Sequence, residues 1–277
     1  DHDGGFDLVP EVEDQALQCA PGFDPSAGLH ALATHAAAEH PSAFGWRGGL
    51  AEARSLGWAV HDGELRRLDT TIEPLPEVGA CLRRLAPAWR LAGLLSLAFA
   101  EDFALIEAAT ARIPWLAVTL PSHWAPEQKV GLHFAQVHAP VTDSELLRAA
   151  ADGLARLVAG PTRWERFVWT VTPRATLNAH PALQPLSHWH PDDADTVAGQ
   201  AFWRTERQTF ISVPAAGLAV FTILVQVLPL AQAIDTPAKA HRLHEALASM
   251  SPAVLHYRGL VDARDPLLDW LARRARA

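Results

Sequence analysis

Histidines between positions 121 and 141 are the first residues whose types and spacing could do chemistry. His123, His133 and His138 lie there among Pro, Trp and Lys residues. A His at the end of an extended segment and beside a Pro is well placed to ligate a metal ion or a cofactor, because the backbone fixes the direction of its ring. The same positions also suit a half-buried His that hydrogen-bonds to a carbonyl group, so the residues alone leave both interpretations open.

A second group is Arg-Thr-Glu-Arg-Gln-Thr at positions 204–209. In a strand, Arg204 and Glu206 share one face, whereas Arg207 lies on the other. Charged side chains on both faces of a central strand are costly unless they are paired or bind a ligand. Arg is suited to holding carboxylates, because its planar guanidinium group donates two parallel hydrogen bonds. The segment therefore predicts either an anion clamp or a ladder of ion pairs between strands.

A third group lies between positions 180 and 193. His188, His190 and Asp192, with His180 upstream, are ligand types that Zn(II) or Fe(II) can use. The surrounding Pro and Ser residues are typical of a surface loop, where such clusters are mostly solvated. The hypothesis of a metal-dependent hydrolase depends on His188 and His190 alone, and metal analysis of the protein would test it.

The elements that must position these groups are helices and strands without strict alternation. Strands are predicted at 115–120, 131–138, 167–172, 202–211 and 218–228. Helices are predicted at 26–39, within 51–56, at 143–159, 237–250, 252–258 and 266–274. Ser251 and Asp265 are the expected N-caps of the last two, and the pattern over 81–111 is also helical, with a break at Pro87. A hairpin turn at 214–217 and an antiparallel sheet are expected, which gives an α+β fold.

Composition and charge narrow the class of protein. The formal net charge of -8 argues against a broad phosphate-binding surface, so nucleic acid is not expected as a partner. Cys19 and Cys81 are the only two cysteines, which excludes a disulfide framework or a thiolate cluster within the chain and fits a cytoplasmic protein. The longest apolar run, 213–230, is interrupted by Gly, Thr, Gln and Pro, so we expect a buried strand there and no membrane association.

Short motifs along the chain, in their order, resemble those of the catalytic alpha subunit of the haem-dependent oxidative N-demethylase family. The most specific is the Arg-Thr-Glu-Arg-Gln-Thr segment at 204–209. The others are Pro-Ser-His-Trp at 121–124 with Lys129 and Gly131, Val-His-Ala-Pro-Val at 137–141, Gly217 with Phe-Thr-Ile at 221–223, Pro-Leu at 229–230 and Tyr-Arg-Gly-Leu at 257–260. After 221–223 the family usually continues Arg-Thr-Tyr, whereas this chain has Leu-Val-Gln at 224–226, so a basic group is missing. The first 80 residues show little resemblance.

The resemblance implies a haem b protein with a PAS-like antiparallel sheet flanked by helices. Residues 81–277 would form the PAS-like haem-binding domain, and residues 1–80 a variable N-terminal region of helical and irregular structure. The implied activity is oxidative demethylation of a small secondary amine such as dimethylamine, with O2 and with electrons from a partner reductase that carries flavin and an iron–sulfur cluster. A non-catalytic haem-binding sensor or carrier on the same fold is the alternative, and the sequence leaves open whether the protein is an oligomer.

We expect His138 to be the axial ligand of the haem iron. In the predicted strand, His138 shares an apolar face with Leu132 and Phe134, whereas His133 points the other way. A ligating imidazole should also donate its second nitrogen to a carbonyl or carboxylate group, which fixes the ring. His123, beside a Trp in a Pro-bounded turn, is the runner-up.

The remaining site predictions follow the same motifs. His180, His188 and His190 are expected in a loop too mobile to hold an iron. The other predicted cofactor-binding residues, with the two arginines on opposite sides of their strand, are Arg204, Arg207, Lys129 and Trp124. Glu206 is the predicted catalytic residue, with the role of orienting the amine.

Overall fold

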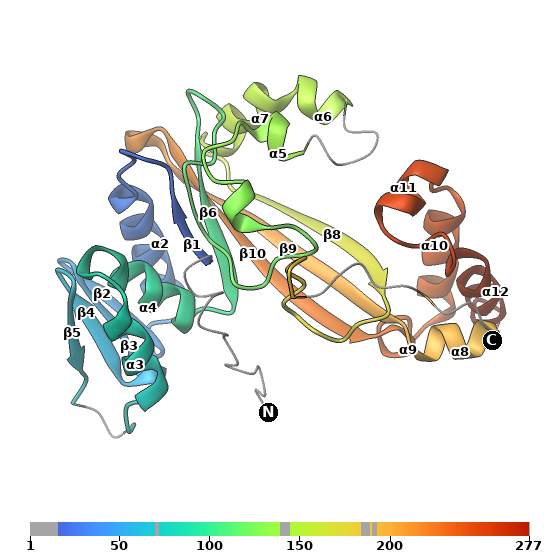
Figure 1. Ribbon diagram of the computed structural model, residues 1–277, viewed down its shortest axis with the longest axis horizontal. Helices are drawn as coiled ribbons and strands as arrows, with labels where there is room; N and C mark the ends of the chain where they lie inside the picture. Colours follow the sequence, from blue (N-terminus) through green and yellow to red (C-terminus); the bar gives the residue numbers. More distant parts are fainter. Residues whose placement is uncertain (1–15, 70–71, 139–144, 184–188, 190–192, 277) are drawn as a thin grey trace.

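The computed structural model describes residues 16–69, 72–138, 145–183, 189 and 193–276 (Figure 1). Two antiparallel sheets and the helices around them confirm the predicted α+β fold. The larger sheet has the strand order β1-β7-β6-β10-β9-β8, and the smaller has the order β2-β3-β4-β5. The PAS-like character of the larger sheet stays a prediction. Within the described ranges, no helix is long and apolar enough to cross a membrane.

The larger sheet is built around one long hairpin, which runs between the two ends of the molecule (Figure 1). β9 (Phe202–Val213) and β10 (Leu218–Pro229) pair along their whole length, and Gly217 adopts the left-handed φ of 64° that the turn requires. This confirms the predicted hairpin. The other strands of the sheet are β1 (Leu17–Cys19), β7 (Trp115–Ala117), β6 (Glu101–Glu107) and β8 (Trp164–Thr172).

The smaller sheet lies in the region before position 80, which we expected to be helical and irregular. Its strands are β2 (Phe44–Arg47), β3 (Leu50–Ala53), β4 (Trp58–His61) and β5 (Glu64–Arg67). The helix predicted within 51–56 is instead β3 followed by a 3-10 turn. Three helices pack with this sheet: α2 (Ser26–Glu39), α3 (Pro76–Arg84) and α4 (Arg90–Ala98).

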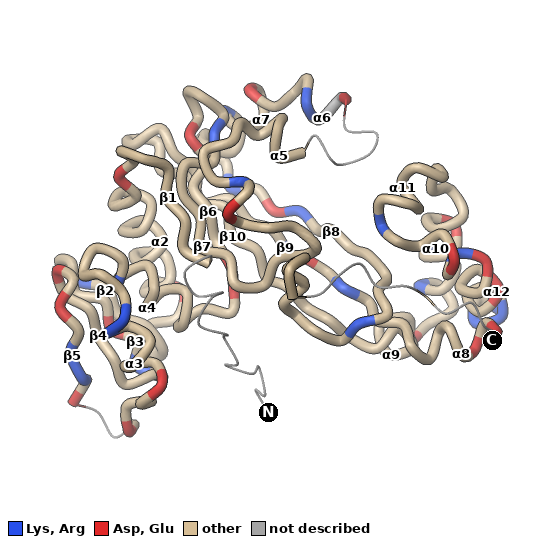
Figure 2. The backbone as a smooth tube through the Cα atoms, viewed as in Figure 1, with Lys and Arg blue, Asp and Glu red and all other residues tan. Residues whose placement is uncertain are grey.

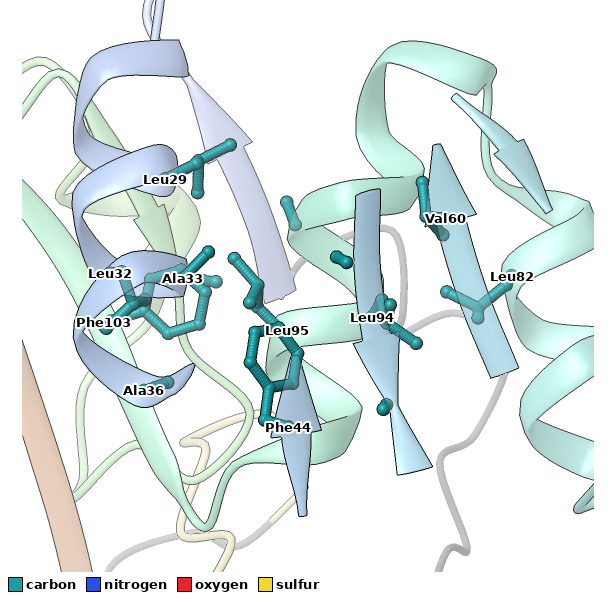
Figure 3. Packing of buried hydrophobic residues seen from close by; sticks show 14 of the residues in the cluster. Leu29, Leu32, Ala33, Ala36, Phe44, Val60, Leu82, Leu94, Leu95 and Phe103 are labelled. Carbon is teal, nitrogen blue, oxygen red and sulfur yellow. The ribbon is translucent and has the colours of Figure 1, made fainter. Parts of the chain in front are cut away.

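A shared hydrophobic core joins this region to the larger sheet. Figure 3 shows Ala33 of α2, Phe44 of β2 and Leu95 of α4 close to Phe103 of β6. All four side chains are buried, with Leu95 fully excluded from solvent. Residues on both sides of position 80 therefore stabilise each other through the same buried apolar surface.

The C-terminal helices form a second core at the far end of the hairpin. They are α8 (Ala194–Gly199), α9 (Leu230–Ala233), α10 (Pro237–Ala248), α11 (Pro252–Tyr257) and α12 (Arg264–Arg274). The predictions for the last three helices are confirmed, with small shifts at the ends. Ser251 caps α11 as predicted, because its side chain accepts from the Val254 amide. Asp265 lies within the first turn of α12, whose N-cap is Ala263.

A third core covers one face of the larger sheet beneath α5 (Phe134–Val137), α6 (Glu145–Ala149) and α7 (Ala151–Val158). Two predictions fail here. The strand expected at 131–138 is a turn followed by α5, because His133 begins a capping box: its ring accepts from the Ala135 amide, and the Gln136 side chain accepts from the His133 amide. The single helix expected at 143–159 is divided into α6 and α7, and its start lies outside the described residues.

The helical pattern expected to continue through 103–111 is also wrong, because residues 101–107 form β6. Five consecutive residues of β6 are buried, and a strand buried on both faces has no alternation of apolar and polar residues. The break expected at Pro87 is confirmed, since a 3-10 turn at Pro87–Trp89 separates α3 from α4.

Candidate functional site

A chain of polar side chains crosses the face of β8 and β9 that lies under the third core. Basic and acidic residues both occur along these two strands (Figure 2). Arg166 on β8 is in register with Gln208 on β9, and its Nε donates a hydrogen bond to Gln208 Oε1. Gln208 Nε2 donates to Glu206 Oε2 at 2.6 Å, and Ser122 Oγ donates to Glu206 Oε1. Both oxygens of the Glu206 carboxylate are thereby fixed in direction.

Arg204 lies at the end of this chain of polar side chains and is buried between two loops. The residue is 3% exposed, and its Nε donates to Ser122 Oγ at 2.9 Å. The other two nitrogens donate to backbone carbonyl groups, Nη1 to Thr176 at 3.2 Å and Nη2 to Leu177 at 2.8 Å and Leu120 at 3.3 Å. The guanidinium group therefore ties the loops around 120 and 176 to the sheet.

Arg207 lies on the opposite face of β9, as strand alternation predicts. Its guanidinium group is about half exposed and forms an ion pair with Glu165, which is similarly exposed. Arg204 and Arg207 thus use their guanidinium groups on protein atoms in this structure. Of the two alternatives predicted for this segment, Arg207 follows the ion pair between strands.

Asp102 on β6 holds the same loop from the other side. Its carboxylate accepts hydrogen bonds from the Thr119 amide and hydroxyl, both at 2.8 Å, and from the Leu120 amide at 2.9 Å. Burial raises the pKa of Asp102 to about 6, against these hydrogen bonds, and the negative charge of Glu206 adds to the rise. The loop that carries Ser122 is therefore fixed by Asp102 and Arg204 together.

His138 follows α5 with its ring oriented by the helix. Its Nδ1 is 2.9 Å from the Phe134 carbonyl oxygen, so Nδ1 carries the proton and Nε2 the lone pair. The ring centroids of His138 and Phe134 are 4.1 Å apart. Among the described residues, no side chain or backbone group hydrogen-bonds to Nε2. We predicted the proximity of His138 and Phe134 from strand alternation, but it arises because residues four apart share a helix face.

Burial and nearby cations favour the neutral form of His138. Burial is the largest cause that lowers the pKa of His138, and the charges of Arg166 and Lys129 lower it further, against the hydrogen bond to Phe134. A neutral imidazole with a protonated Nδ1 is the form that ligates a metal through Nε2. Lys129 lies beside this helix end, since its Nζ is 3.4 Å from the Val137 carbonyl oxygen.

An open apolar pocket lies between α5, α7 and strands β6, β8 and β9, and its lining includes Phe134, whose ring contacts that of His138. Its cavity volume is about 140 Å³. Phe134, Phe210 and Trp164 are among its apolar walls, and Arg166 and Glu165 are its charged lining residues. Trp124 packs half-buried against the same core as Phe134 and Phe210. An apolar wall with a cation at its edge suits an amphipathic ligand.

Two other histidines have different surroundings. His123 is partly buried and adopts a left-handed φ of 62°, and its pKa is lowered by burial and then by the charge of Arg204. His180, expected in a mobile loop, is instead buried at 4% exposure. Its Nδ1 accepts from the Ala182 amide, and its Nε2 lies 3.3 Å from Glu127 Oε2. That prediction is wrong, because burial of the ring and these two contacts give His180 a fixed place.

The predicted metal cluster is not tested by the structure. His188 and His190 lie outside the described residues. Among the residues that are described, no group of three or more His, Cys, Asp and Glu side chains could hold a metal ion.

Sequence reasoning missed the role of Arg166, Ser122 and Gln208. Ser122 and Gln208 lie within the motifs, yet nothing local showed that Glu206 bonds to both. Arg166 belongs to no motif, and only the pairing of β8 with β9 brings it to Gln208. The register between β8 and β9 would have identified Arg166, but that register cannot be read from a single segment of sequence.

Comparison with known proteins gives a family for the chain. The model of a family described as haem-dependent oxidative N-demethylase, alpha subunit-like, matches residues 13–268. The match includes most of the N-terminal region in which the short motifs showed little resemblance.

Proposed function

Because the chain belongs to the haem-dependent oxidative N-demethylase alpha subunit-like family, we propose that it is a haem-binding catalytic subunit that demethylates a small secondary amine. The family description itself gives haem dependence and a place as one subunit of a complex. The use of haem b, O2, a dimethylamine-like substrate and a partner reductase belongs to the proposal. The observation that carries it is the orientation of His138, whose Nδ1 donates to the Phe134 carbonyl group.

The residues around His138 fit a haem group in three respects. His138 presents a neutral imidazole nitrogen, the usual protein ligand of haem iron. The adjoining pocket offers aromatic walls for an apolar macrocycle. Lys129 and Arg166 place positive charge near His138 and would be available to pair with haem propionates. Bound haem would supply the oxygen-dependent oxidation of the amine, and the chain would bind, orient and shield the reactants.

Glu206 is the group that we propose to orient the amine. Its carboxylate is held by Ser122 and Gln208, so it is fixed relative to the sheet. A protonated amine is attracted to a carboxylate, and a fixed carboxylate selects one orientation of the ammonium group. Glu206 is half-buried, so a small amine has access to it.

The alternative, a haem sensor or carrier, drew support from the missing basic group at positions 224–226. Leu224 of β10 is in register with Arg207, on the face of the sheet that points away from Glu206. Val225, which is in register with Glu206, is buried. The departure from the family pattern therefore lies away from the polar chain, which favours the catalytic proposal. Turnover of secondary amines with a reductase separates the two functions.

Spectroscopy of ligand variants tests the haem assignment. Haem-free wild-type protein, His138→Ala and His123→Ala would each be titrated with haemin while the Soret band is recorded. We expect a sharp Soret band in the wild type and in His123→Ala, and its loss in His138→Ala, with unchanged circular dichroism. Added imidazole should restore the band in His138→Gly, because it replaces the missing ligand. A normal haem spectrum in His138→Ala would refute the assignment.

A further inference from the structure

The guanidinium group of Arg166 has donors that are not used in hydrogen bonds to described residues. Its Nε donates to Gln208 Oε1, while neither Nη atom has a hydrogen-bond partner among the residues that the structure describes. Arg166 lines the apolar pocket next to His138. Glu206 is within electrostatic reach, but the hydrogen bond that Arg166 makes goes to Gln208 and not to the Glu206 carboxylate. The free side of the guanidinium group is therefore suited to an acceptor from outside the chain.

The direction of Arg166 is set by the sheet. β8 and β9 pair so that Arg166 stands opposite Gln208, a residue only 5% exposed. Gln208 is itself bonded to Glu206, and Glu206 is connected through Ser122 to the Arg204 clamp. A side chain anchored through its Nε to a buried network loses little further entropy when its two Nη atoms bind a ligand.

The large apolar residues around Arg166 are more exposed than such side chains usually are on a protein surface. Trp164 and Val168, which share its face of β8, are 41% and 36% exposed, and Leu157 of α7 is 45% exposed. Large apolar side chains grouped in this way mark a ligand or partner site. A ligand that covers them must have a broad apolar body, and one that uses Arg166 must also carry an anionic group.

We propose that Arg166 binds a propionate carboxylate of the haem, in the role that the sequence suggested for Arg204 and Arg207. This inference rests on the proposed function. Arg204 is excluded from the role because its nitrogens are taken by Ser122 and backbone carbonyl groups. Arg207 is excluded because it lies on the other face of β9, paired with Glu165. The bond formed is a charge-assisted hydrogen bond between the Nη groups and the carboxylate oxygens.

Haemin and its dimethyl ester test the proposal, because the ester has the same apolar body but uncharged propionate groups. Haem-free full-length protein would be titrated with each ligand, with Soret absorbance as the readout. We expect the wild type to bind haemin about tenfold more tightly than the ester, as one charge-assisted hydrogen bond allows. Arg166→Met should lose most of this preference by weakening haemin binding alone, and Arg166→Lys should keep part of it.

Arg207→Met is the matched control, since it removes a guanidinium group from the other face of the same strand pair. It should leave the preference for haemin unchanged. An Arg166→Met variant that retains the full preference, or that weakens haemin and ester binding equally, would overturn the proposal. If the wild type gives no Soret band with either ligand, the proposed function fails, and this inference fails with it.

Discussion

Burial can change the pKa of a single residue more than its hydrogen bonds do, and Asp102 is the clearest case in this protein. Three donors point at its carboxylate, yet burial still raises the pKa of Asp102 from 3.8 to about 6. The folded state therefore holds the proton more tightly than the unfolded chain does. It follows that Asp102 stabilises the fold fully below about pH 3.8, and that this contribution is lost as the pH rises through about 6.

The pH dependence of stability should show this loss. Between pH 4 and pH 7 the contribution of Asp102 to the free energy of unfolding should fall by about 2–3 kcal/mol, the equivalent of its pKa shift. In Asp102→Asn this decline is absent, so the difference between wild type and variant should change with pH over that range. Urea denaturation at several pH values measures it. Parallel stability profiles for the two proteins would contradict the prediction.

The site residues show which single-residue inferences the sequence supports. His138 and Phe134 were correctly paired, because a separation of four residues puts side chains on the same side of either a strand or a helix. The assigned strand was still wrong. Arg166 could not be chosen over Arg204, since their different surroundings depend on residues 42 and 82 positions away along the chain.

At the scale of elements, Arg204 is the connection between β9 and the two loops at 120 and 176. Arg204→Lys would leave several of its partly buried carbonyl partners without their present donor, because an ammonium group cannot span the same acceptors. Each unsatisfied carbonyl costs about 1–3 kcal/mol, so we expect a loss of roughly 2–5 kcal/mol in the free energy of unfolding. Arg207→Lys, which changes an exposed ion pair, should cost less than about 1 kcal/mol.

Urea denaturation of the two Lys variants measures these losses. Equal and small losses would show that Arg204 is not a structural clamp. Hydrogen exchange at the amides near 120 and 176 gives a second readout, because these loops should open more often in Arg204→Lys than in Arg207→Lys.

A helix or strand could be predicted where neighbouring residues in the sequence determine it. The closing helices have Pro in their first turn and, for α11, a Ser cap, so their positions follow from neighbouring residues. β6 has no such signal, because burial on both faces removes the alternation that identifies a strand. The small sheet β2–β5 was missed for a related reason, since its strands are only four residues each.

In the molecule as a whole, the three cores are connected by the β9–β10 hairpin (Figure 1). Three members of the polar chain, Arg204, Glu206 and Gln208, lie on β9. The first core stabilises the end near α2, and the second stabilises the end near α8–α12. Between them, the face that carries Glu206 and Gln208 continues from Phe210, which belongs to the third core and lines the open pocket. The architecture thus provides a rigid base on which a ligand can be held from one side.

The supply of electrons is also a property of the whole molecule. Oxidation of an amine methyl group by O2 requires electrons from a donor, and an iron–sulfur cluster requires several thiolate ligands. The chain has two cysteines, Cys19 in β1 and Cys81 in α3, and neither is disulfide-bonded. Its sequence also has no Gly-rich phosphate loop of the kind that binds dinucleotides.

We therefore predict that haem-loaded protein with NADPH, O2 and dimethylamine releases no formaldehyde beyond a single turnover. Addition of a flavin- and iron–sulfur-containing reductase should make formaldehyde release continuous, and His138→Ala should abolish it under the same conditions. Continuous release by the chain with NADPH alone would show that it carries its own path for electrons.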